Sequence, residues 1–154
     1  MTVAVGKPAP DFTMPTDGGG SVSLKDLKGK KVVLYFYPKD DTPGCTKEAC
    51  GFRDAMPDFS GLDAVIIGVS RDSVAKHDKF KTKYELPFTL ASDENGKTSE
   101  AYGTWVEKSM YGKKYMGMER ATFLIDEAGV LRNEWRKVKV PGHVEAVLEA
   151  VKAG

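Results

Sequence analysis

Two cysteines, Cys45 and Cys50, carry the most evident chemistry in this sequence, and they are the only two in its 154 residues. A thiolate is a nucleophile that peroxides and disulfides oxidise, and neighbouring thiols can be joined as a disulfide. Two cysteines five positions apart do not make the disulfide framework of a small secreted domain. The pair is therefore either two buried structural thiols or a catalytic or redox-sensing site of a reducing compartment.

The residues before Cys45 predict the start of a helix. Thr42 is of a type favoured at the N-cap, and Pro43 suits the first helical position. Cys45 then lies in the first turn, where free backbone N–H groups and the positive end of the helix dipole favour a thiolate. A helical face continues beyond it, and Pro57 is expected to disturb the helix; the face consists of Ala49, Phe52, Arg53 and Met56.

The helix alone does not make a reactive thiolate. A helix dipole contributes about 0.3–1 kcal/mol at an exposed site, whereas one pKa unit corresponds to about 1.36 kcal/mol. A thiol with an ordinary pKa of about 8.5 would stay mostly protonated at neutral pH with that help. A reactive Cys45 therefore needs an arginine or lysine from elsewhere in the fold.

The elements that must position Cys45 begin with a continuously apolar run at residues 32–37, which is typical of a central strand covered on both faces. A second apolar run, residues 64–69, follows the helix. Strand, helix and strand at this spacing predict a right-handed unit with parallel strands. Cys45 would then follow the carboxyl end of a strand, where open α/β sheets bind ligands.

The other patterns complete one α/β domain over residues 1–154, with a mixed sheet. A glycine cluster at 18–20 favours a hairpin turn over a phosphate-binding loop. Residues 105–118, rich in Met, Tyr and Trp, are expected to form a flexible loop over the core, with a partner surface as the alternative. The remaining expected elements are a short helix at 24–27, a helix from Ser73 to Tyr84, a strand at 88–90, a helix at 97–102, an antiparallel hairpin at 121–135, and a helix from Pro141 with Val144, Val147, Leu148 and Val151 on one face.

Composition excludes several classes of function. Hydrophobic residues make up 41%, charged residues 29%, and the net charge is +1, which is ordinary for a globular protein and gives no general attraction to nucleic acid or anionic membranes. The longest apolar runs hold six residues, against about 20 for a membrane span, and no signal peptide is evident. A cytoplasmic protein is expected. His77 and His143 lie far from the cysteines in polar helical segments, so we expect them to be solvated and predict no metal site.

The residues around Cys45 resemble the motif of a known family. Pro38-x-x-x-Thr42-x-x-Cys45 is similar to the signature of the peroxiredoxins, which are thiol peroxidases with a thioredoxin-like fold. The second cysteine five residues later resembles the subgroup called bacterioferritin comigratory protein or peroxiredoxin Q. The likeness covers nearly the whole chain, including residues 6–12 and 120–126. It implies a central mixed sheet flanked by helices, with an N-terminal β-hairpin.

The resemblance implies a role for each residue of the motif. Cys45 would be the nucleophile that attacks a peroxide, and Arg120 would supply the missing cation. Thr42 would place its hydroxyl beside the thiolate, and Pro38 would shield the pocket from water. The N–H groups of Gly44 and Cys45 would bind the substrate oxygen. Glu48 also matches a family position, without a clear role.

Cys50 would resolve the oxidised Cys45 as a redox-active disulfide. Residues i and i+5 of an ideal helix lie roughly 8–9 Å apart between Cα atoms, whereas disulfides usually need about 4.4–6.8 Å. The first turns of the helix would therefore unwind in each cycle, helped by the weak helix former Gly51. The resemblance further implies hydrogen peroxide and alkyl hydroperoxides as substrates, thioredoxin as reductant with glutaredoxin as the alternative, a monomer or weak oligomer, and no metal, haem or flavin.

Two other functions are possible alternatives for a protein with these residues. A thioredoxin-like disulfide reductase or isomerase would have a Cys-x-x-Cys motif, which the observed spacing does not match. A redox sensor or chaperone would react once with peroxide and expose an apolar helix face, formed by Phe52, Met56 and Phe59.

Overall fold

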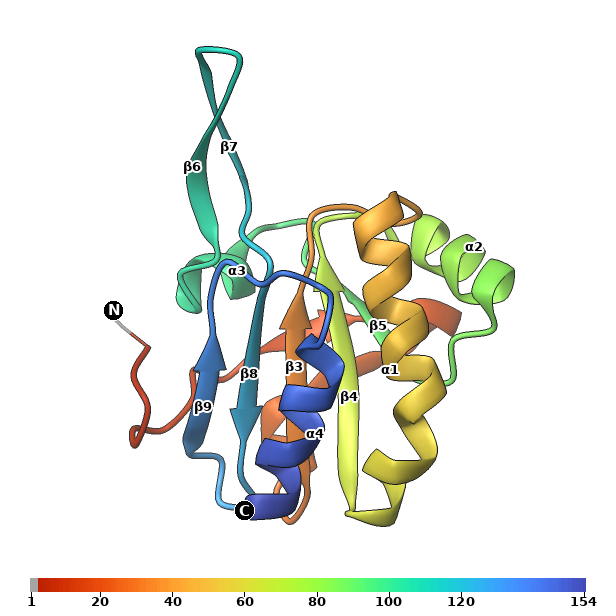
Figure 1. The fold of residues 1–154 in the computed structure, drawn as a ribbon, viewed down its shortest axis with the longest axis vertical. Coiled ribbons are helices and arrows are strands. Elements are labelled where there is room, and N and C mark those ends of the chain that lie inside the picture. Colours follow the sequence, from red (N-terminus) through yellow and green to blue (C-terminus); the bar gives the residue numbers. More distant parts are fainter. Residues whose placement is uncertain (1–2) are drawn as a thin grey trace.

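A five-stranded mixed sheet forms the centre of the computed structural model, which describes residues 3–154 (Figure 1). Its order is β5-β4-β3-β8-β9; the strands are β3 (Lys31–Phe36), β4 (Ala64–Ser70), β5 (Thr89–Ser92), β8 (Ala121–Ile125) and β9 (Leu131–Trp135). β3, β4 and β5 are parallel, whereas β8 and β9 pair antiparallel. The apolar run at 32–37 does form the central strand, as predicted.

Helices and a small hairpin cover the two faces of the sheet. One face carries α1 (Pro43–Gly61), α2 (Val74–Tyr84) and α4 (His143–Ala153), whose apolar residues pack with Val33, Tyr35 and Tyr37 of the β3 region. Over the other face lie the N-terminal hairpin of β1 (Thr13–Pro15) and β2 (Ser21–Ser23), the short helix η2 (Leu24–Leu27), and α3 (Lys97–Ala101). The short helix η1 (Asp17–Gly19) instead contacts α2 and β5. Apart from η1, which was expected to be a plain turn, and the end of α1, these elements match those predicted from the sequence within a few residues.

Helix α1 is longer than expected, because it runs through Pro57 to Gly61. The prediction that Pro57 disturbs the helix is therefore wrong. Pro57 lies on the exposed side, where the carbonyl that lacks its usual N–H partner can be solvated.

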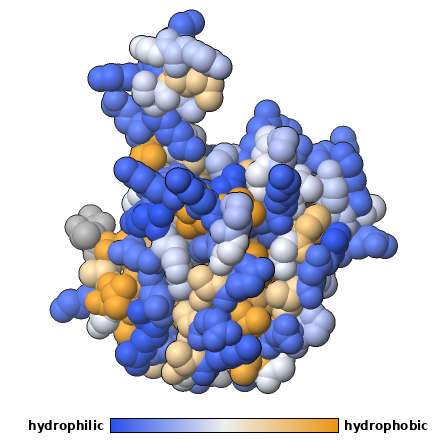
Figure 2. All heavy atoms as spheres, in the orientation of Figure 1, coloured by the Kyte–Doolittle hydropathy of each residue, from blue (hydrophilic) through white to orange (hydrophobic). Residues whose placement is uncertain are grey.

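Residues 105–118 form a hairpin rather than a loop over the core. Its strands are β6 (Trp105–Met110) and β7 (Lys113–Met118), which pair with each other in a separate two-stranded sheet. Tyr111 and Gly112 join them with φ values of 51° and 77°, and a two-residue hairpin turn of the type I′ class needs positive φ at both positions. The hairpin projects from the body (Figures 1 and 2), and Tyr111 is 98% exposed at its tip.

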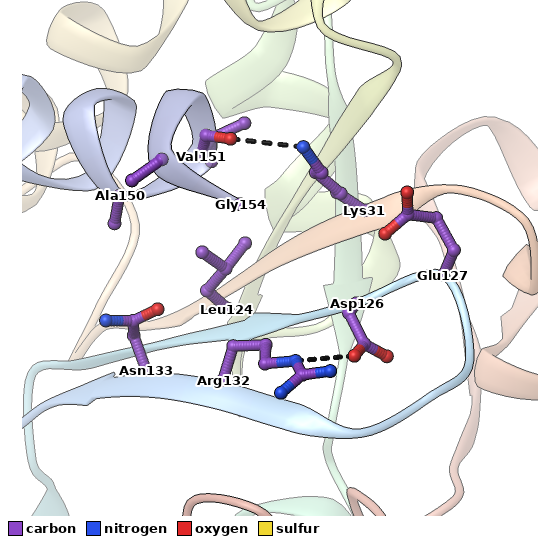
Figure 3. Close-up of a pocket in the computed structure, with 10 residues that line it drawn as sticks. Lys31, Leu124, Asp126, Glu127, Arg132, Asn133, Ala150, Val151 and Gly154 are labelled. Carbon is purple, nitrogen blue, oxygen red and sulfur yellow. Dashed lines mark hydrogen bonds and ion pairs between the residues drawn. The ribbon is translucent and has the colours of Figure 1, made fainter.

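A pocket of about 380 Å³ lies at the opposite end of the sheet from Cys45, between the end of α4 and the β8–β9 hairpin (Figure 3). Lys31 Nζ donates to the Val151 carbonyl oxygen at 3.1 Å. Arg132 pairs with Asp126 across the same pocket at 2.6 Å. None of the lining residues belongs to the segment around Cys45. Within residues 3–154, no helix is long and apolar enough to cross a membrane, and no cluster of three metal-ligating side chains is found.

Candidate active site

Cys45 is the third residue of α1, as the sequence predicted. The helix begins at Pro43, and its first backbone bond runs from the Thr46 N–H to the Thr42 carbonyl at 2.8 Å. Thr42 occupies the N-cap position, but its hydroxyl donates to the Lys39 carbonyl at 2.9 Å instead of accepting from the helix. This bond uses the hydroxyl hydrogen and leaves acceptor capacity on Oγ1. The Cys45 residue is only 2% exposed.

Arg120, at the start of β8, brings a cation to the thiol. Its Nη2 donates to Cys45 Sγ at 3.3 Å, and its Nη1 donates to Glu48 Oε1 at 2.7 Å. The arginine side chain is 17% exposed and the glutamate side chain 0%. Burial alone lowers the pKa of Arg120, but the charges of Glu48 and Cys45 outweigh it and raise the pKa above its ordinary value. The structure thus provides next to Cys45 the positive charge that the helix dipole cannot supply alone.

Glu48 is the buried carboxyl beneath this arginine. Burial raises its pKa from 4.5 to about 7, against the opposing effect of Arg120. Its Oε2 has no hydrogen-bond partner within the described part of the chain and lies 4.0 Å from His143 Nε2. Glu48 lies one helical turn after Cys45, so its place on the buried face was a signal available in the sequence.

His143 is buried, and the expectation that both histidines are solvated is wrong. His143 is 6% exposed and His77 0% exposed. The Nε2 of His143 lies 2.7 Å from Thr122 Oγ1. Burial, assisted by the charge of Arg120, lowers the pKa of His143 from 6.5 to about 4. His143 is therefore a neutral neighbour of Glu48 at neutral pH.

The segments on either side of Cys45 hold the other predicted site residues. Pro38 is exposed two residues after the end of β3. Gly44 comes close to the arginine, because a Cβ atom there would lie 3.1 Å from Arg120 Nη2. The N–H groups of Gly44 and Cys45, at the second and third helical positions, have no partner within the helix.

Cys50 is a half-buried free thiol on the same unbroken helix, and Cys45 is free as well. Next to it, a Cβ atom at Gly51 would lie 3.0 Å from Val144 Cγ2 of α4. Glycine at this position thus permits the close approach of α1 and α4, a packing reason that the sequence did not reveal.

The fold and this site define a class: an α/β protein with a mixed central sheet and a buried cysteine at a helix N-terminus, contacted by arginine. The sequence model described as the AhpC/TSA family matches residues 5–134. The peroxiredoxin Bcp of Bacillus subtilis is 57% identical over 152 residues, covering 99% of this chain and 97% of the relative. This chain therefore belongs to the AhpC/TSA family, within its group of bacterioferritin comigratory proteins and Q-type peroxiredoxins.

Solved structures show the same relationship. The bacterioferritin comigratory protein of Xanthomonas campestris, studied for its alkyl peroxide reduction activity, superposes with a TM-score of 0.92 at 43% identity, covering 97% of this chain and 98% of that one. PrxQ of Xylella fastidiosa gives a TM-score of 0.93 at 39% identity, covering 98% and 96%. The thioredoxin-like fold of peroxiredoxin type is thus confirmed.

Proposed function

We propose that this protein is a thiol peroxidase that reduces hydrogen peroxide and organic hydroperoxides. The observation that carries the proposal is the 3.3 Å contact between Arg120 Nη2 and Cys45 Sγ at the start of α1. This contact stabilises a thiolate and also places a donor where charge develops on the peroxide oxygen. The alkyl peroxide reduction activity of the Xanthomonas campestris protein supports organic hydroperoxides as substrates.

In the first step, the Cys45 thiolate attacks one peroxide oxygen and the O–O bond breaks. The sulfur becomes a sulfenic acid, and the other oxygen leaves as hydroxide or alkoxide and takes a proton to become water or alcohol. Arg120 donates hydrogen bonds to both the thiolate and the departing oxygen. The N–H groups of Gly44 and Cys45 and the Thr42 Oγ1 complete the contacts to the substrate, and Pro38 shields the pocket.

In the second step, the Cys50 thiol attacks the Cys45 sulfenic acid, which forms the disulfide and releases water. Both residues lie on one continuous helix, five positions apart. The Cα separation in an intact helix, roughly 8–9 Å, exceeds the usual disulfide range of about 4.4–6.8 Å. The first turns of α1 therefore unwind before the bond forms.

A dithiol protein, which we take to be thioredoxin, then reduces the disulfide and restores both thiols while its own cysteines are oxidised. We propose a monomer as the working unit. The chemistry needs only thiols and a hydrogen-bonding arginine, so we propose no metal, haem or flavin.

NADPH-coupled peroxide consumption with thioredoxin and thioredoxin reductase tests these steps. We expect Cys45→Ser to be inactive. Cys50→Ser should lose turnover with thioredoxin but still react once with peroxide. Full activity of Cys45→Ser would refute the proposed nucleophile. One reaction per molecule of wild type, with every reductant present, would instead indicate a sensor.

A further inference from the structure

The segment between β3 and α1, residues 38–42, is attached to α2 through two aspartates. The Asp41 carboxylate accepts from Lys83 Nζ and from the Tyr84 hydroxyl, both at 2.8 Å. Asp41 itself has a φ of 59°, in the left-handed region that residues other than glycine rarely adopt. These contacts hold a strained backbone directly before the turn that carries Cys45.

Asp40 makes the more deeply buried contact. Its Oδ2 lies 2.6 Å from His77 Nδ1, and its side chain is 5% exposed while that of His77 is 0% exposed. The Tyr37 hydroxyl donates to Asp40 Oδ1 at 2.5 Å. The Asp40 N–H donates to Asp72 Oδ2 at 2.8 Å. Asp40 is thus held by Tyr37, which directly follows β3, by His77 of α2, and by Asp72 in the turn after β4.

The hydrogen-bond partners of His77 determine where its protons lie. His77 Nε2 is 3.0 Å from the Ala91 carbonyl oxygen, which can only accept, so Nε2 carries a hydrogen. His77 Nδ1 and Asp40 Oδ2 must then share a second proton, because two lone pairs 2.6 Å apart would repel. The docked segment therefore contains one titratable proton in a buried pair.

We propose that His77 is a positioning residue for the peroxide site: the proton it shares with Asp40 keeps residues 38–42 docked and α1 wound, and its loss releases them. The first turns of α1 must unwind for the Cys45–Cys50 disulfide to form, and release of the segment that precedes them would permit this unwinding, so the inference rests on the proposed function. The pair would favour attack on peroxide while it is protonated and formation of the disulfide once it is deprotonated.

The surroundings of the pair set the direction of its pH dependence. Burial lowers the pKa of His77, but the hydrogen bond and charge of Asp40, the Ala91 carbonyl and the charge of Asp72 together raise it above 6.5. The Tyr37 hydroxyl also faces the pair, and Lys76 Nζ lies 4.0 Å from Asp72 Oδ1. The hollow that Asp40 and Asp72 line is bordered by further charged groups, Lys39, Asp41, Lys79 and Lys83. A raised folded-state pKa means that docking is complete below pH 6.5 and weakens as pH rises through the raised value.

Two variants distinguish the contribution of the shared proton to docking from the contribution of side-chain packing. His77→Leu removes both donors and should release the segment at every pH. Asp40→Asn can donate its amide hydrogen to the unprotonated Nδ1 of a neutral imidazole and still accept from Tyr37. It should keep the segment docked without the shared proton, so docking should no longer depend on pH. Phe80→Leu is the matched control, since Phe80 is 2% exposed on the same face of α2 and contacts neither Asp40 nor Ala91 by a hydrogen bond.

Amide hydrogen exchange of the fully reduced protein, without peroxide, measures docking directly. We expect protection of residues 40–46 in wild type, corrected for the intrinsic exchange rate, to fall by at least about tenfold between pH 6.5 and 9. Asp40→Asn should show no such fall, and His77→Leu should exchange at least about tenfold faster at pH 6.5. Phe80→Leu should keep the wild-type pH profile. Identical profiles in wild type and Asp40→Asn would overturn the proposal.

Imidazole ¹⁵N resonances give an independent measurement. At pH 6.5 His77 should carry hydrogens on both nitrogens, whereas His143 should be neutral; a neutral His77 at that pH would also overturn the proposal. Rapid-mixing kinetics then link docking to catalysis. His77→Leu should react more slowly with peroxide and form the disulfide faster. A wild type without peroxidase activity would refute the proposed function, while the exchange and NMR results would still decide the role of His77.

Discussion

Glu48 contacts Arg120 through one oxygen only. Oε1 accepts from Nη1 at 2.7 Å, while Oε2 has no hydrogen-bond partner among residues 3–154. This single contact leaves the other arm of the guanidinium pointing at Cys45, where Nη2 lies 3.3 Å from the sulfur. The planar fork of arginine allows both contacts at once, and a lysine ammonium has no such geometry.

Arg120→Lys should therefore keep the charge and still lose most of the peroxide reaction. We expect the second-order rate constant with hydrogen peroxide to fall by about 10²-fold or more, the size of effect seen when one donor to a developing oxyanion is removed. Stopped-flow measurement of the reduced protein checks this, with thermal unfolding as the control for folding. A rate within about threefold of wild type would show that the reaction does not need the planar geometry of arginine.

Glu48 and His143 should have opposite effects on how stability depends on pH. Glu48 has its pKa raised from 4.5 to about 7, so the folded state binds the extra proton and stability falls as pH rises through that window. His143 has its pKa lowered from 6.5 to about 4, so the unfolded state binds the extra proton and stability rises with pH. In wild type the two contributions largely cancel between pH 4.5 and 6.5.

Single variants should reveal each contribution. Between pH 4.5 and 6.5, Glu48→Gln should gain roughly 2–3 kcal/mol of unfolding free energy relative to wild type, and His143→Asn should lose a similar amount. Urea unfolding at three pH values measures how the unfolding free energy of each variant depends on pH. The double variant is the control, because it lacks both contributions. Parallel curves for wild type and Glu48→Gln would show that Glu48 stays ionised throughout.

The central strand, the helix start and the position of Cys45 could be predicted because each depends on local sequence. A continuous apolar run needs burial on both faces, and Thr42-Pro43 provides a residue type favoured at the N-cap followed by one favoured at the first helical position. The pairing of Cys45 with Arg120 has no local signal, since the two residues are 75 positions apart. Only the resemblance to a family pointed to it.

The wrong predictions for the two histidines and for residues 105–118 also have physical causes. His77 lies on one helical face with Phe80 and Tyr84, and His143 with Val147 and Val151, so their helical spacing indicated burial despite polar neighbours. The β6–β7 hairpin was missed because Tyr111-Gly112 is an unusual turn sequence, in which a tyrosine adopts positive φ.

Gly44→Ala should separate stability from reactivity. Alanine is about 1 kcal/mol better than glycine within a helix, although less so in the first turn, so stability should be unchanged or higher. Its Cβ would lie 3.1 Å from Arg120 Nη2, an atom held in place by Cys45 and Glu48. We therefore expect the peroxide rate to fall by about threefold to tenfold. An unchanged rate would show that the arginine moves aside without consequence for the reaction with peroxide.

Gly51 is the position where helix packing and helix opening oppose each other. Gly51→Ala alone should destabilise the protein, because its Cβ would lie 3.0 Å from Val144 Cγ2 and would force α1 and α4 apart. In a Val144→Ala background that contact is gone, and the same change should stabilise α1 by up to about 1 kcal/mol.

If α1 must unwind for Cys50 to reach the sulfenic acid, that added helix stability should slow disulfide formation by up to about fivefold relative to Val144→Ala. The peroxide step should not change, because Gly51 lies beyond the turn that carries Cys45. Rapid-mixing fluorescence or mass spectrometry of the sulfenic acid resolves the two steps. Disulfide formation as fast as in Val144→Ala alone would mean that the bond forms without unwinding this part of α1.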